Sequence, residues 1–134
     1  MKRIVFALLL SSPLLSPLAF ASDCTTGAET QGEVIECEYS TNFAPLEHQI
    51  KKEYESLLAD IENSTIAAGK THEAMVAAQK SWLTYRENTC EFALLKEGGG
   101  TVAWGIKYSC MMEFSKARLK TLQRYRKELA GQAE

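Results

Sequence analysis

Apolar residues recur at helical spacing along most of the chain after residue 30, with polar residues between them. From Leu46 to Ile61 the apolar positions are separated by four, four, three and four residues, which forms one stripe of an amphipathic helix. Two later segments continue the pattern. The positions predicted to face inward are Leu46, Ile50, Tyr54, Leu57 and Ile61; then Met75, Ala78, Trp82, Tyr85, Thr89 and Phe92; then Tyr108, Met111, Ser115, Arg118, Leu122, Tyr125 and Leu129, with Ile106, Cys110 and Phe114 widening the last stripe. No alternating strand pattern of useful length appears, so the sequence predicts an all-α fold, a small bundle of three to four helices with antiparallel long helices.

Capping and breaking residues set the start of this bundle. Thr30 and Glu33 have the spacing of a capping box, which predicts a first helix with Val34 and Cys37 on its inner side. Pro45 cannot donate a backbone hydrogen bond and disfavours helical geometry at the residue before it. We therefore expect a break or kink here, with the proline in the first turn of a second helix.

The later helix boundaries are predicted from glycines and a threonine. Residues 63–70 are expected to end the second helix and form a loop, after which Thr71 caps a third helix with Glu73 in its first turn. The third helix should end near Glu97, because three consecutive glycines at 98–100 cannot sustain it. The fourth and longest helix is expected to run from about Thr101 to Ala130.

One stripe of the third helix mixes chemical types that rarely face a core together. Gln79, Trp82, Arg86 and Cys90 are separated by three, four and four residues, so they lie on one side of the helix. Buried polar groups require specific partners. Other segments are therefore expected to supply hydrogen-bonding groups to this stripe.

The first twenty-one residues have the features of a cleaved signal peptide. Lys2 and Arg3 precede an unbroken apolar run over 4–10, and Ala19-Phe20-Ala21 is a small-residue cleavage signal. No second apolar span follows, so no membrane anchor is expected after cleavage. We predict a signal peptide over 1–21, a single domain over 22–134, and export to the periplasm or beyond it.

Cleavage there would leave 13 basic and 17 acidic residues, a net charge of −4. This mild acidity, without a basic patch interleaved with aromatics, gives no case for a nucleic-acid partner, and none is expected. A cationic protein partner is compatible with it.

All four cysteines, Cys24, Cys37, Cys90 and Cys110, lie in the exported part, where disulfides form readily. Three pairings are possible, and we favour Cys24–Cys37 with Cys90–Cys110 because these close the shortest loops. The second bond would clamp the third helix to the fourth across the triglycine turn. A zinc site is the rival interpretation, but no two cysteines have C-x-x-C spacing and only two histidines could assist.

In combination, several motifs resemble the LprI-like N-terminal domain family, small exported bacterial proteins named after a lysozyme inhibitor. The matching residues are Gln31, Glu33 and Cys37; Ile50-Lys-Lys-Glu-Tyr54; Gln79-x-x-Trp82-x-x-x-Arg86-x-x-x-Cys90; Gly98–Thr101 and Cys110; and Ser115-x-x-Arg118-x-x-x-Leu122. The resemblance covers nearly all of the mature chain. It departs from the family pattern in the second helix, where Glu47 stands for the usual aspartate and Lys51 for the usual asparagine.

Two interpretations apply to the arginines of this motif. An exposed guanidinium could engage carboxylates of a partner in bidentate fashion, whereas an inward one would pair with a carboxylate such as Glu47 beside Trp82. Both Arg86 and Arg118 lie on inward stripes, so we favour the inward interpretation. Six residues are accordingly predicted to have a structural role: Tyr54, Glu47, Gln79, Trp82, Arg86 and Arg118.

The sequence carries no catalytic motif. His48 and His72 fall on outer faces without a neighbouring nucleophile, and no cofactor or metal is expected. The loop formed by Gly98, Gly99, Gly100 and Thr101 lacks the lysine and strand context of a phosphate loop, so it is expected to be a tight turn and secondarily a contact loop.

The leading functional hypothesis follows from the family resemblance: a periplasmic protein that occludes a lysozyme or another peptidoglycan-cleaving enzyme. An immunity-type protein that neutralises a toxin hydrolase in the periplasm is the alternative, and a purely structural envelope protein is another. An enzyme would need a polar cleft with a perturbed titratable group.

Overall fold

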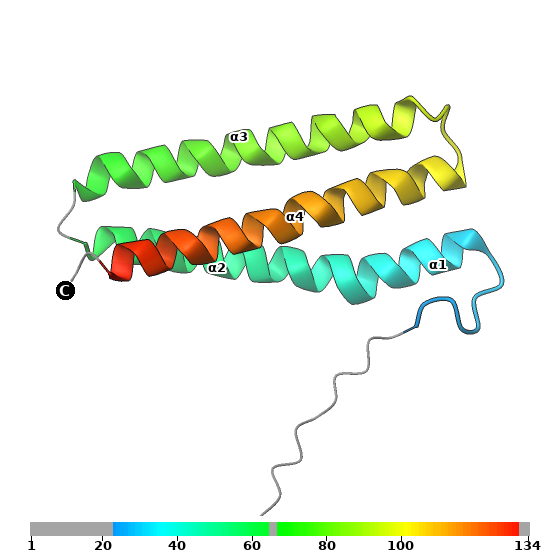
Figure 1. The fold of residues 1–134 in the computed structure, drawn as a ribbon, viewed down its shortest axis with the longest axis horizontal. Helices are drawn as coiled ribbons and strands as arrows, with labels where there is room; N and C mark the ends of the chain where they lie inside the picture. The colour runs from blue at the N-terminus through cyan, green and yellow to red at the C-terminus, as the bar shows by residue number, and fades with distance from the viewer. Residues whose placement is uncertain (1–22, 65–66, 132–134) are drawn as a thin grey trace, which may run out of the picture.

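The computed structural model describes residues 23–64 and 67–131, and the predicted signal peptide lies outside these ranges. The described elements are α1 (Gln31–Glu38), a π-helical segment η1 (Tyr39–Phe43), α2 (Ala44–Glu62), α3 (Ala68–Leu95) and α4 (Thr101–Ala130). α1, η1 and α2 follow one another without a gap and form one bent rod (Figure 1). The described part of the chain is therefore an all-α bundle of three antiparallel rods, as the sequence predicts.

The first rod begins at the predicted capping box. The Thr30 hydroxyl accepts the Glu33 N–H at 3.2 Å, and the Glu33 carboxylate accepts the Thr30 N–H at 2.9 Å. Hydrogen bonds from the Glu29 and Thr30 amides to this carboxylate lower the pKa of Glu33. The sequence prediction for this helix start is confirmed.

The break or kink expected at Pro45 takes the form of a single π-helical turn in the bent rod. The Ala44 N–H donates to the Tyr39 carbonyl, five residues back, and Ala44 keeps helical geometry with φ −61° and ψ −42°. Ala44 therefore keeps the helical geometry that the following proline disfavours, and the chain does not break here. The rod continues through the π turn although Pro45 has no N–H to donate. Phe43 is the last residue of this turn, and its side chain is buried in the interior.

The turn between α2 and α3 is shorter than predicted. α3 already begins at Ala68, and the residue before it, Ala67, has a positive φ of 23°. Thr71 lies inside the helix and its hydroxyl donates to the Ala67 carbonyl, so it is not the N-cap. Glu73 accordingly lies beyond the first turn.

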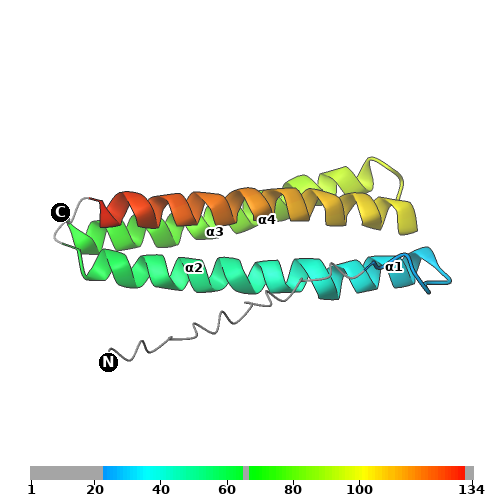
Figure 2. The same ribbon diagram turned by 60° about the horizontal axis from the view of Figure 1, so that its bottom comes forward.

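The three rods run side by side (Figure 2), and the apolar core takes residues from all of them. Its buried members are Leu46, Ile50, Leu57, Ile61, Met75 and Leu122, with Tyr54, Leu58, Trp82, Met112, Leu119 and Leu129 packed against it. The stripe predicted for α2 is thus confirmed. In α3 and α4 the inward predictions for Ala78, Tyr85, Phe92 and Tyr125 are wrong, because these side chains are exposed.

Both predicted disulfides are present, Cys24–Cys37 and Cys90–Cys110, each with a Cα–Cα distance of 5.6 Å. All four cysteines are consumed by these bonds, which excludes the rival zinc site on thiolate ligands. None of the helices in the described ranges is long and apolar enough to cross a membrane.

Candidate functional site

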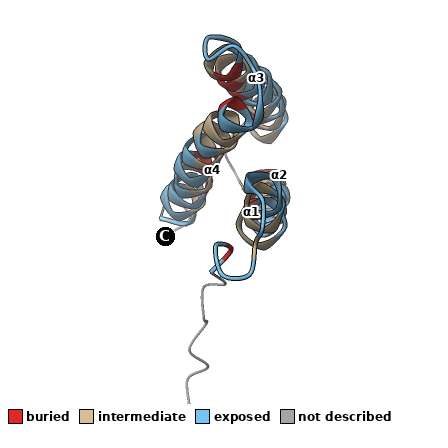
Figure 3. Ribbon diagram, turned by 90° about the vertical axis from the view of Figure 1, so that its right-hand side faces the viewer, coloured by how far each residue is buried: buried red, intermediate tan, exposed pale blue. Residues whose placement is uncertain are grey.

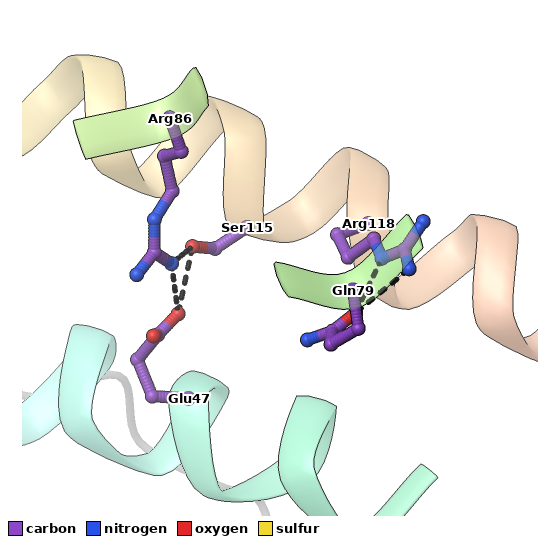
Figure 4. Close-up of polar contacts among 5 residues, drawn as sticks. All are labelled: Glu47, Gln79, Arg86, Ser115 and Arg118. Carbon is purple, nitrogen blue, oxygen red and sulfur yellow. Dashed lines mark hydrogen bonds and ion pairs between the residues drawn. The ribbon is translucent and has the colours of Figure 1, made fainter. Parts of the chain in front are cut away.

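A polar layer crosses the middle of the bundle and takes one residue from each rod (Figure 4). Arg86 of α3 donates through one terminal nitrogen to the Glu47 carboxylate at 2.6 Å and to the Ser115 hydroxyl at 2.7 Å. Ser115 in turn donates to the same Glu47 oxygen at 2.8 Å. We call Glu47, Arg86 and Ser115 the polar layer. Each of its three side chains hydrogen-bonds to the other two, so the polar layer joins α2, α3 and α4.

Most of the polar layer is buried, which indicates that it stabilises the fold. Arg86 is 6% exposed and Ser115 is fully buried, whereas the Glu47 side chain keeps 30% of its surface in water. Arg86 Nε is buried without a hydrogen-bond partner among the described residues. The cation is therefore held inside the protein by one carboxylate and one hydroxyl, which makes it sensitive to the loss of either.

Trp82 lies between the two motif arginines. The Arg86 guanidinium carbon is 4.6 Å from the centre of its ring, and that of Arg118 is 5.5 Å away. Arg118 donates from Nε and Nη2 to the Gln79 side-chain oxygen, at 2.9 and 2.7 Å. Burial lowers the pKa of Arg118, whose ordinary value is high enough that the side chain stays charged.

The inward interpretation of both arginines is therefore the one the geometry supports, with one correction. Arg86 pairs with Glu47 as predicted, although Glu47 replaces the aspartate usual in the family. Arg118 pairs with the amide of Gln79 and not with a carboxylate, because the one carboxylate in the layer already serves Arg86. Lys51, at the other departure, is exposed and lies 3.9 Å from Glu55.

The polar layer has no geometry for nucleophilic catalysis. The Ser115 hydroxyl is inaccessible and donates to a carboxylate that is already paired with a cation. His48 is exposed, and His72 lies 3.3 Å from Glu62 at the opposite end of the bundle from the disulfides. No cluster of three potential metal ligands occurs within residues 23–64 and 67–131.

Two further ion clusters were missed by the sequence reasoning. Lys107 of α4 contacts Glu87 at 2.8 Å and Glu91 at 2.5 Å on α3, and the hydrogen bonds that its ammonium group donates to these carboxylates raise its pKa. Toward the other end, Arg126 bonds Asp60 at 2.7 Å and Glu53 at 3.0 Å on α2. The i, i+4 spacing of Glu87 and Glu91 was the available signal, but its partner depended on the register of α3 against α4.

The predicted contact loop is a tight turn between α3 and α4. Gly98, Gly99 and Gly100 have φ values of 76°, 81° and 88°, a region that other residues enter only with strain. No atom lies within 4 Å of where a Cβ would stand at any of the three. The glycines are therefore required by backbone conformation, and the space around the turn is open.

These features define a small disulfide-bonded helical protein whose motif residues hold its rods together. A family model described as Lysozyme inhibitor LprI matches residues 21–122, which is most of the chain. The chain belongs to the LprI family. No curated protein and no solved structure matches it significantly.

Proposed function

We propose that this protein is an exported inhibitor that binds a lysozyme or another peptidoglycan-cleaving enzyme and blocks its glycan-binding cleft. The observation that carries this proposal is the family match, which spans residues 21–122 and includes the polar layer and both disulfides. The family is one of inhibitors, and this favours a binding role over a catalytic one.

Two properties of the chain support the proposal. Two disulfides suit an oxidising compartment outside the cytoplasm, where lysozymes act. A domain that begins at residue 22 carries a net charge of −4, so a cationic enzyme would be attracted to it over long range. The motif arginines do not supply the contact surface, because both are buried.

The test is an inhibition assay with the domain 22–134 against c-type, g-type and i-type lysozymes, at low and at physiological salt. We expect stoichiometric inhibition of at least one type, with affinity falling by about tenfold or more as salt screens the attraction. An unrelated protein of equal size and net charge is the control for non-specific capture of a cationic enzyme. Full lysis by all three types at a tenfold molar excess of the domain would contradict the proposal.

A further inference from the structure

Charge is separated along the length of the bundle, and the polar layer marks the boundary. We define the acidic half as residues 23–46 with 87–114, and the basic half as residues 48–64, 67–85 and 116–131. The acidic half has nine carboxylates and two lysines, a net charge of 2 − 9 = −7. The basic half has ten cations and six carboxylates, a net charge of 10 − 6 = +4. The net charges of the two halves add to −3. The difference from the net charge of the whole chain, −2, comes from residues outside the described ranges.

The acidic half lies at one end of the molecule. α1 and the turn between α3 and α4 are both at the right of Figure 1, while the turn between α2 and α3 is at the left. The carboxylates of this half are Asp23, Glu29, Glu33, Glu36, Glu38, Glu87, Glu91, Glu97 and Glu113. Its two lysines are already matched, since Lys107 lies between Glu87 and Glu91 and Lys96 lies 3.4 Å from Glu97. An approaching protein therefore meets uncompensated negative charge at this end.

The same end exposes large apolar side chains. Phe92, Leu95, Val102 and Trp104 lie within six residues of the triglycine turn and are 68%, 63%, 67% and 56% exposed. Figure 3 looks at the molecule from this end and shows the turn as exposed. Large apolar groups rimmed by charge are typical of protein contact surfaces. We call these four residues, together with Gly98–Gly100, the apolar tip.

The apolar tip is held rigidly by the structure beneath it. The Cys90–Cys110 disulfide joins α3 to α4, and Cys90 is fully buried. The Lys107 ammonium lies 5.4 Å from the centre of the Trp104 ring while it bonds to Glu87 and Glu91. A contact surface whose backbone and anchor side chain are fixed in advance loses little conformational entropy on binding.

We propose that the apolar tip and the acidic surface around it are the site that docks on a cationic glycan-cleaving enzyme. The apolar tip enters the concave glycan-binding cleft, Trp104 is the principal anchor, and the carboxylates face basic residues on the cleft rim. The basic half would be repelled by such an enzyme, so the charge separation also sets the orientation of docking. This inference rests on the proposed function and assigns it a surface.

The first experiment measures the inhibition constant of Trp104→Ala and of a matched control, Tyr125→Ala. Tyr125 is an exposed aromatic on the same helix but in the basic half. We expect Trp104→Ala to weaken inhibition by about 30-fold or more, as for an anchor residue, and Tyr125→Ala by less than about threefold. Both variants should keep the wild-type melting midpoint within a few degrees, because neither side chain is buried: Trp104 is 56% and Tyr125 38% exposed.

The second experiment compares two double charge reversals that change the net charge of the domain by the same amount. Glu36→Lys with Glu113→Lys alters the acidic half, and Glu55→Lys with Glu73→Lys alters the basic half; all four side chains are exposed. Each pair raises the net charge by four, so a purely global attraction would respond equally to both. We expect only the first pair to slow association, by about tenfold at 50 mM salt, with the difference disappearing in high salt.

The outcomes separate the two proposals. If the wild-type domain inhibits a lysozyme but Trp104→Ala and the first charge pair inhibit equally well, the docking surface is wrong and the proposed function stands. If the wild-type domain inhibits none of the three lysozyme types, both proposals are overturned.

Discussion

Replacing Arg86 by alanine should lower the free energy of unfolding by about 3–5 kcal/mol, the cost of breaking a buried ion pair by removing one partner. The change removes the hydrogen bonds to Glu47 and Ser115 and the contact with the Trp82 ring, at a side chain that is 6% exposed. In a domain of this size the melting midpoint should fall by roughly 12 °C or more. Thermal unfolding followed by far-ultraviolet circular dichroism measures it.

The matched control is Arg124→Ala. Arg124 is on α4, its side chain is 62% exposed, and its ion pair is with Glu128 one turn away at 3.7 Å. Exposed pairs of this kind contribute little, so the midpoint should change by no more than the equivalent of about 0.5 kcal/mol. An unchanged midpoint for Arg86→Ala together with lost lysozyme inhibition would show that Arg86 is a contact residue and not a structural one.

Removing the Cys90–Cys110 disulfide should be the second most damaging change. The bond closes a loop with a sequence separation of 20 between two helices that pack along their length, and its loss should cost about 3 kcal/mol. We expect the Cys90→Ala, Cys110→Ala double variant to unfold at a midpoint at least roughly 10 °C lower, and to inhibit less well because α3 and α4 are no longer fixed beneath the apolar tip.

The other disulfide provides the comparison. Cys24–Cys37 joins the irregular lead-in to α1 and does not link the long rods. Unfolding of α2, α3 and α4 should therefore respond less to the Cys24→Ala, Cys37→Ala variant, although sequence separations of 13 and 20 predict similar losses from loop entropy alone. Equal losses from the two double variants would contradict this account of how the bundle is clamped.

Helical periodicity predicted the class of fold and the inward stripe of α2, because the buried residues of that helix form a continuous apolar face. The three glycines predicted where α4 begins. Pro45 predicted the π turn only as a break or kink. A proline shows that a hydrogen bond is missing, but not whether the chain bends away or absorbs the defect within the helix. The wrong cap at Thr71 has a similar cause, since a threonine can also bond back to a carbonyl inside a helix, as it does here.

Among the candidate site residues, too, some contacts could be predicted from the sequence and others could not. The Arg86–Glu47 pair could be predicted because a buried cation needs a carboxylate, and Glu47 lies on a neighbouring inward stripe. Ser115 was also placed inward, but its bonds to both partners depend on how α4 is aligned against α2 and α3. Phe92 was predicted to lie in the core because apolar residues usually do, and it is 68% exposed. The periodicity of α3 does not show where the helix runs past the end of the core, which is where Phe92 lies, six residues before the first glycine of the turn.

We propose that the motif residues build the scaffold while the apolar tip contacts the enzyme, and hydrogen–deuterium exchange can test this claim. The backbone amides of residues 99–103 include the first turn of α4, where N–H groups have no partner within the helix, so they exchange readily in the free domain. With a saturating lysozyme we predict strong slowing at these amides and none at residues 63–64 and 67–70, which form the opposite end. Protection confined to the opposite end, with residues 99–103 unchanged, would contradict the claim.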